Sequence, residues 1–206
     1  MAITIFTLII LFFSIAIHEI AHGSMAYHLG DPTAKNEGRL SLNPVKHIDV
    51  FGTIILPLIL LIITQGRGPI IGWAKPVPVN PYNFRDRKWG SLKVSIAGPA
   101  VNFLVALFFG LIIRFIHLPE NLLTLFAIIV IYNFAWGIFN LIPIPPFDGS
   151  HILFSFLGEK FFKVKNFLRQ YGLFILIIFI FWGGLNLVFL GANWLFYLIC
   201  GSIPSI

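Results

Sequence analysis

The stretch ITIFTLIILFFSIAIHEIAHGSMAYH, residues 3–28, is the part of the sequence that says most about the fold. It contains no charged or titratable side chain before His18 and Glu19. Crossing a hydrocarbon core of about 30 Å takes ~20 residues of α-helix, so the stretch is predicted to span a membrane. No basic region precedes it, which distinguishes it from a cleaved signal peptide.

The composition of the whole chain supports this reading. Of the 206 residues, 58% are hydrophobic and 11% are charged, and the mean hydropathy is +0.91. Soluble domains are about 25% charged, so a water-soluble globule is excluded. We expect one membrane-embedded domain over residues 1–206, with a core at 3–155 and C-terminal helices at 171–200. The only cysteine, Cys200, excludes a disulfide framework and a multi-cysteine metal site.

Further apolar stretches predict an all-α integral membrane protein. The bundle should have four to five transmembrane helices, a re-entrant segment and an extended loop at the membrane surface. Residues 51–64 are too short to span and carry Pro57, so they are predicted to be re-entrant. The expected elements are spans at 92–116, 122–142 and 171–190, a Pro- and Gly-rich loop at 66–84, and an amphipathic interfacial helix at 158–170.

The first span carries the sequence His18-Glu19-Ile20-Ala21-His22. Positions i and i+4 of a helix share one face, so both imidazoles can reach one metal ion with Glu19 beside it. Such polar groups are costly at membrane depth unless they are paired, bound to metal or next to water. The alternative is that the two histidines only form hydrogen bonds within the bundle.

A catalytic zinc ion needs a third protein ligand and an open position for water. Among the eight carboxylates, only Glu19 and Asp148 adjoin a spanning segment within an otherwise uncharged stretch. Prolines end the third span before Asp148, and Gly149 permits a sharp turn that directs the carboxylate into the bundle. The alternative is a turn or capping aspartate at the surface. His151, three residues further on, could compete as a ligand, but the carboxylate is favoured.

The net charge of +6 comes from basic residues scattered between apolar runs, which is typical of loops flanking membrane spans and predicts no nucleic-acid partner. If residues 51–64 are re-entrant, Asp148 lies on the same side as His18 and His22. Arg114 is then the only one of the 14 Lys and Arg residues on the opposite side. The positive-inside rule therefore places the candidate site toward the cytosol.

Several motifs together resemble the site-2 protease family of intramembrane zinc metalloproteases, peptidase family M50, in a compact prokaryotic subgroup without a PDZ or CBS domain. One departure is Ser150, where the family usually has a second glycine after the aspartate. The matching stretches are 18–22, the segment SIAGPAVN at 95–102, NLIPIPPFDG at 140–149, GDPTA at 30–34, GRLSLNP at 38–44 and GWAKPVPVNP at 72–81.

The resemblance implies that His18, His22 and Asp148 bind one zinc ion and that Glu19 is the general base. Asn102 or Asn140 would hold the substrate backbone or the oxyanion, although packing hydrogen bonds are an equal alternative. The resemblance also implies that this chain is a multi-pass protein of the prokaryotic cell membrane. Its substrate would be a transmembrane helix of another protein in the same membrane. Because that helix must unwind before attack, the loop at 66–84 could offer it a strand edge; a plain surface loop is the alternative.

Other functions use the same residues differently. A membrane zinc or cation transporter would need the ligands but no general base. A prenyl-processing type of membrane protease would need a glutamate ligand on a later helix, where the sequence has none. A catalytically inactive binding protein would not need the complete set of ligands and base.

Overall fold

The computed structural model describes residues 2–55, 58–59, 62–63, 65 and 75–201. Within these ranges the chain forms helices and no strands, which confirms the predicted all-α class. Shorter 3₁₀ or π-helical turns are η1 (Pro44–His47), η2 (Val50–Ile55), η3 (Pro81–Asn83) and η4 (Glu159–Phe161). The α-helices are α1 (Ala2–His28), α2 (Thr33–Asn36), α4 (Gly90–Phe115), α5 (Glu120–Asn140), α6 (Asp148–Phe156), α7 (Phe162–Phe181) and α8 (Gly184–Cys200).

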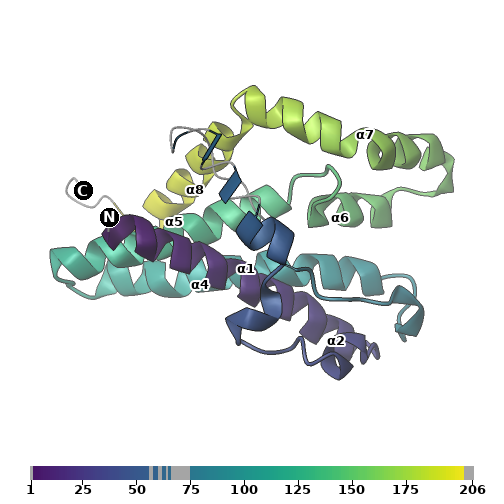
Figure 1. The fold of residues 1–206 in the computed structure, drawn as a ribbon, viewed down its shortest axis with the longest axis horizontal. Coiled ribbons are helices and arrows are strands. Elements are labelled where there is room, and N and C mark those ends of the chain that lie inside the picture. Colours follow the sequence, from purple (N-terminus) through teal and green to yellow (C-terminus); the bar gives the residue numbers. More distant parts are fainter. Residues whose placement is uncertain (1, 56–57, 60–61, 64, 66–74, 202–206) are drawn as a thin grey trace.

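Helices α1, α4 and α5 lie side by side and α8 packs against α4 and α5 (Figure 1). The buried core between α4, α5 and α8 includes Ala106, Val130, Phe134 and Ala192. Small residues such as the two alanines let membrane helices approach closely. Four described helices, α1, α4, α5 and α7, are long and apolar enough to cross a bilayer. Their outer faces carry exposed large apolar side chains, as expected of an all-α membrane protein.

Helices α1 and α5 run in the same direction and α4 runs opposite to them (Figure 1). The first turns of α4 therefore lie beside the last turns of α1, where His22 Nδ1 is 2.7 Å from the Val94 carbonyl oxygen. The connection between α1 and α4 thus returns to the end at which α1 finishes. The predicted re-entrant conformation itself lies in part outside the described residues.

The C-terminal part differs from the sequence prediction. The sequence predicted an interfacial helix at 158–170 followed by a separate span at 171–190. This prediction is wrong, because a single helix, α7, begins at Phe162 and ends at Phe181. The break occurs at Gly183, whose φ of +86° is a left-handed conformation that favours glycine. A Cβ on the next residue, Gly184, would collide with the Phe179 ring, so the close turn between α7 and α8 needs glycine there.

The loop predicted at 66–84 is described only from residue 75 onward. Residues 75–80, which we call the strap, contain no helix and run alongside α1. Prolines at positions 76 and 78 account for this, because each disfavours a helical conformation in the residue before it. The strap ends at η3, where the Asn80 side chain accepts a hydrogen bond from the Tyr82 N–H.

Candidate metal centre

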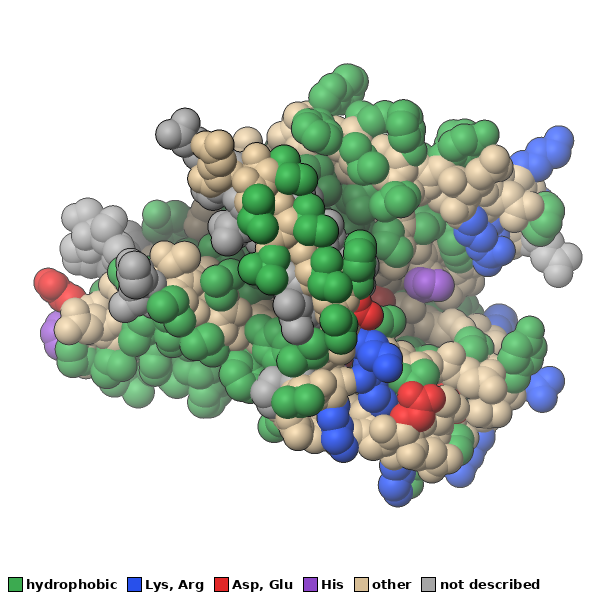
Figure 2. Space-filling view, viewed as in Figure 1, with side chains coloured by type: hydrophobic (Ala, Val, Ile, Leu, Met, Phe, Trp, Pro, Cys, Tyr) green, Lys and Arg blue, Asp and Glu red, His purple; other side chains and the backbone are tan. Residues whose placement is uncertain are grey.

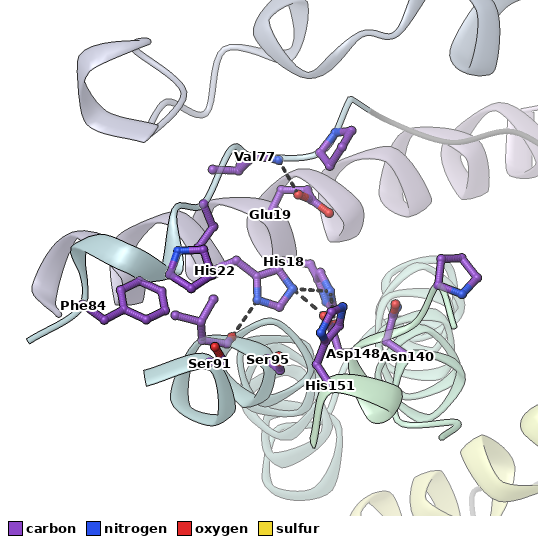
Figure 3. Close-up of a pocket in the computed structure, with 15 residues that line it drawn as sticks. His18, Glu19, His22, Val77, Phe84, Ser91, Ser95, Asn140, Asp148 and His151 are labelled. Atoms are coloured by element: carbon purple, nitrogen blue, oxygen red, sulfur yellow. Dashed lines mark hydrogen bonds and ion pairs between the residues drawn. The ribbon is translucent and has the colours of Figure 1, made fainter. Parts of the chain in front are cut away.

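His18 and His22 project from one face of α1 toward Asp148 at the start of α6 (Figure 3). The two Nε2 atoms are 3.0 Å apart. The Asp148 Oδ2 atom is 3.0 Å from His18 Nε2 and 3.2 Å from His22 Nε2. Within the described part of the chain, this is the only group of three His, Cys, Asp or Glu side chains close enough to hold one ion.

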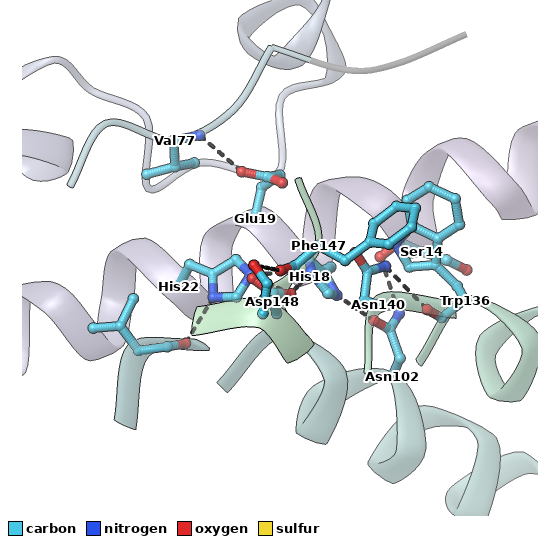
Figure 4. A network of polar contacts seen from close by, with 12 residues as sticks. Ser14, His18, Glu19, His22, Val77, Asn102, Trp136, Asn140, Phe147 and Asp148 are labelled. Atoms are coloured by element: carbon cyan, nitrogen blue, oxygen red, sulfur yellow. Dashed lines mark hydrogen bonds and ion pairs between the residues drawn. The ribbon is translucent and has the colours of Figure 1, made fainter. Parts of the chain in front are cut away.

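The hydrogen bonds behind His18 decide which of its ring nitrogens carries the proton. Asn102 Nδ2 donates to the Ser14 carbonyl oxygen at 3.1 Å, and a carbonyl can only accept. This orients the amide so that Asn102 Oδ1 faces His18 Nδ1 at 2.6 Å (Figure 4). Because Oδ1 is also an acceptor, Nδ1 must be the donor, and neutral His18 directs a lone pair on Nε2 into the site.

The same reasoning applies to His22. Its Nδ1 lies 2.7 Å from the Val94 carbonyl oxygen on α4, which requires an N–H at Nδ1. Neutral His22 therefore also directs an Nε2 lone pair toward the same point. Two lone pairs and a carboxylate oxygen within 3.2 Å of one another repel unless a positive charge lies among them. The donor set of two imidazoles and one carboxylate suits zinc, and the fit is therefore good.

Asp148 reaches the cluster because α6 begins close to the end of α5. A Cβ on Gly149 would lie 2.5 Å from the Ile142 carbonyl oxygen, so this close approach needs glycine. The sequence predicted that Gly149 would form a sharp turn. This prediction is wrong, because Gly149 lies inside α6 and has no positive φ. Asp148 does not cap the helix; its Oδ2 atom lies beside the two histidine Nε2 atoms instead.

Asp148 is ionised at neutral pH. Burial by itself raises the pKa of Asp148, but when the histidines also carry protons on Nε2, hydrogen bonding and charge interaction with His18 and His22 outweigh burial and lower the pKa to about 2. The site therefore supplies one negative charge to whatever cation it holds.

Gly98 on α4 makes room for the two imidazoles. A Cβ at this position would lie 2.6 Å from His18 Nε2 and closer still to His22 Nε2. The helix backbone thus forms the floor of the site, and any side chain would enter the space in which the ligand atoms converge.

Glu19 lies beside the cluster rather than within it. Its carboxylate is half-buried, and Oε2 accepts a hydrogen bond of 2.8 Å from the N–H of Val77 in the strap (Figures 3 and 4). Glu19 and the three candidate ligands line one cavity of about 360 Å³. In the space-filling view, a histidine and an acidic side chain are visible in a hollow of the surface, with basic side chains around it (Figure 2).

Known protein families and proteins include several that this chain resembles. Residues 117–179, which include Asp148, match the family model described as Peptidase family M50. A Bacillus subtilis protein named "Putative zinc metalloprotease YwhC" is 40% identical over 157 residues, covering 72% of this chain and 67% of the relative. The chain belongs to peptidase family M50.

Two further relatives of this M50 chain carry similar names. "Putative zinc metalloprotease Rip2" of Mycolicibacterium smegmatis is 27% identical over 188 residues, which cover 90% of this chain and 68% of the relative. "Zinc metalloprotease MJ0392" of Methanocaldococcus jannaschii is 32% identical over 92 residues, 44% of this chain and 27% of the relative. No solved structure matches the chain.

The two asparagines that the sequence of this M50 chain offered as substrate-binding residues lie differently with respect to the cavity. Asn102 is fully buried, and its amide bonds to His18, Ser14 and Asn133, which leaves it pointing away from the cavity. This geometry makes Asn102 a support for His18 instead of a group that contacts substrate. Asn140 lines the cavity and donates one N–H to the Trp136 carbonyl oxygen at 3.0 Å.

Some of the other contributions to the site could not be read from the sequence. The Val94 carbonyl and the Val77 N–H are backbone groups, so their residue type gives no signal. Asn133, buried in the middle of α5, was detectable as a polar residue in an apolar span. His151 lines the cavity but does not belong to the group of three side chains that could hold one ion. The structure therefore does not support His151 as a competing ligand.

Proposed function

We propose that this membrane protein is an intramembrane zinc metalloprotease that hydrolyses a peptide bond within or near a transmembrane helix of another protein. The observation that carries the proposal is the convergence of two imidazole lone pairs and one carboxylate beside Glu19. His18, His22 and Asp148 would hold one zinc ion. When bound, zinc supplies Lewis-acid chemistry, since it lowers the pKa of water toward ~7 and polarises a carbonyl.

Glu19 has the position of a general base. It lines the same cavity as the three ligands and is close to them without occupying a ligand position. Its Oε2 is engaged by Val77 N–H, so Oε1 is the atom available to take a proton from attacking water. The same carboxylate would then pass that proton to the departing amine. Asn140, on the cavity wall, would hold the substrate backbone or the oxyanion.

The surroundings favour a membrane-embedded substrate. The candidate ligands lie where α1 and α6 meet, in a bundle whose described long helices are apolar enough to span a bilayer. A helical peptide bond is shielded by its own hydrogen bonds, so the substrate would have to unwind locally. The strap, three of whose residues line the cavity, would offer an extended backbone for pairing with it.

The orientation of the protein follows from its charges. Arg114 lies at the end of α4 far from the site, and the other basic residues belong to the site end or to connecting segments. We infer that the site faces the cytosol in a prokaryotic cell membrane, because positively charged loops remain on that side. A cysteine-reactive reagent that cannot cross membranes should label an introduced Lys35→Cys only from inside.

The test uses purified protein, zinc, and a panel of single-span model substrates in proteoliposomes, each with an apolar segment of about 20 residues interrupted by helix-breaking residues. Wild type should cleave members of the panel, whereas Glu19→Gln and chelator-treated protein should not. Glu37→Gln, which changes an exposed carboxylate, serves as the matched control. Cleavage that survives in Glu19→Gln, or zinc-loaded wild type that leaves the whole panel intact, would overturn the proposal.

A zinc transporter is the second candidate, because it would use the same three ligands. The position of Glu19 argues against it, since a transport site needs no base held next to the ligands. Zinc flux into vesicles that persists in Glu19→Gln, without proteolysis by wild type, would favour transport.

A further inference from the structure

Arg39, in the segment after α2, is buried next to the strap. Arg39 is 6% exposed, and its guanidinium donates hydrogen bonds to three backbone carbonyl oxygens. Nη1 bonds to Lys46 O, and Nη2 bonds to Lys75 O at 2.7 Å and Pro76 O at 3.0 Å. A buried guanidinium is costly to desolvate, so its position against the strap calls for a physical role.

One peptide group connects Arg39 to Glu19. The carbonyl of the peptide between Pro76 and Val77 accepts from Arg39, and the N–H of the same peptide donates to Glu19 Oε2 at 2.8 Å. This peptide is trans, so its C=O and N–H point to opposite sides. A positive charge at the oxygen polarises the peptide and strengthens the hydrogen bond that its N–H donates.

The strap is fixed at both ends, so the peptide has little freedom to move. At one end, Lys75 N–H donates to the His47 carbonyl oxygen at 2.9 Å. At the other, Asn80 N–H donates to Asp31 Oδ2 at 2.7 Å, and Asp31 is fully buried. The rings of Pro76 and Pro78 restrict the backbone on either side of Val77.

We propose that Arg39 is a positioning residue for Glu19, acting through the Pro76–Val77 peptide group. The inference rests on the proposed function, in which Glu19 is the general base. Arg39 holds the carbonyl, Val77 N–H holds Oε2, and the carboxylate is thereby oriented with Oε1 toward the cavity. Without Arg39 the peptide loses the charge on its oxygen side and Glu19 samples other orientations.

The first test observes the link directly and needs no proteolysis. In protein labelled with ¹⁵N-valine, the Val77 amide is assigned by its loss in Val77→Ile. Its proton resonance should move upfield in Arg39→Gln and in Glu19→Gln, because both changes weaken the same hydrogen bond. Arg39→Lys, which keeps the positive charge, should give an intermediate shift, and Arg87→Gln, at an exposed arginine, should give none. A Val77 resonance unmoved in both Arg39 variants would overturn the inference.

The second test separates positioning from mere stabilisation. Arg39→Gln should retain the zinc content of wild type and a KM within about threefold, while kcat falls about 10- to 100-fold, the range for outer-shell partners. Arg39→Lys should recover part of the loss. Inactive wild type would refute the proposed function and leave the Val77 resonance as the test of the link. Active wild type with unchanged kcat in both Arg39 variants would refute only the role of Arg39.

Discussion

Replacing Gly98 with alanine tests the geometry of the metal centre with one added methyl group. The new Cβ would lie 2.6 Å from His18 Nε2 and closer to His22 Nε2. Contact between such atoms is comfortable near 3.5 Å, so the overlap with each ring is roughly 1 Å. Neither imidazole can simply retreat, because His18 Nδ1 is held by Asn102 and His22 Nδ1 by the Val94 carbonyl.

The expected loss falls on zinc binding more than on folding. Overpacking costs about 1–3 kcal/mol, but alanine in a helix regains about 1 kcal/mol over glycine. The fold should therefore survive. The methyl group enters the space where the lone pairs converge, so the affinity for zinc should fall at least about 100-fold, which is about 2.8 kcal/mol.

The assay is zinc binding by competition with a fluorescent chelator, combined with thermal unfolding of the detergent-solubilised apo-protein. The matched control is Gly191→Ala in α8, where the new Cβ would meet only Ile138 Cδ1 at 3.3 Å. The control should bind zinc as wild type does. A Gly98→Ala protein that folds and binds zinc with wild-type affinity would refute the claim that the two histidines and Asp148 meet over Gly98.

Three other changes probe the supports of the site. Asn102→Leu should weaken zinc binding about 10- to 100-fold, since His18 Nδ1 loses its acceptor; unchanged affinity in equilibrium dialysis would contradict this. Gly149→Ala should displace α6 and lower the zinc content measured by mass spectrometry of the intact protein, because its Cβ would collide with the backbone at the end of α5. Burial raises the pKa of Asp31, but hydrogen bonds from Thr33, Asn80 and Asn83 outweigh burial and hold that pKa below its usual value near 3.9. Ionised Asp31 therefore stabilises the fold above that pH, and its contribution is lost as the pH falls below it. The Tm of Asp31→Asn should lie below that of wild type at neutral pH, and the difference between the two Tm values should shrink in acid. A difference that grows in acid would contradict the claim that ionised Asp31 stabilises the fold.

The apolar runs were sufficient to predict the all-α membrane fold, and the His18–His22 pattern together with the other matching motifs was sufficient to predict the family. Hydropathy identifies spans well because every backbone polar group in a bilayer must be satisfied by helical hydrogen bonds. The same method failed at 171–190, because it averages over Gly183, where a positive φ ends one helix and starts another.

Spacing on one helix determined which residues could share a metal, because the i, i+4 face of α1 is a local property of the chain. The meeting of this face with Asp148, and the tautomers that direct both lone pairs inward, depended on contacts with α4 and α6 that no local pattern encodes. Asn102 illustrates the difference: its residue type permits either substrate binding or support of a ligand. The Ser14 carbonyl, more than 80 residues away in sequence, and the Asn133 side chain on α5 together orient the amide toward His18.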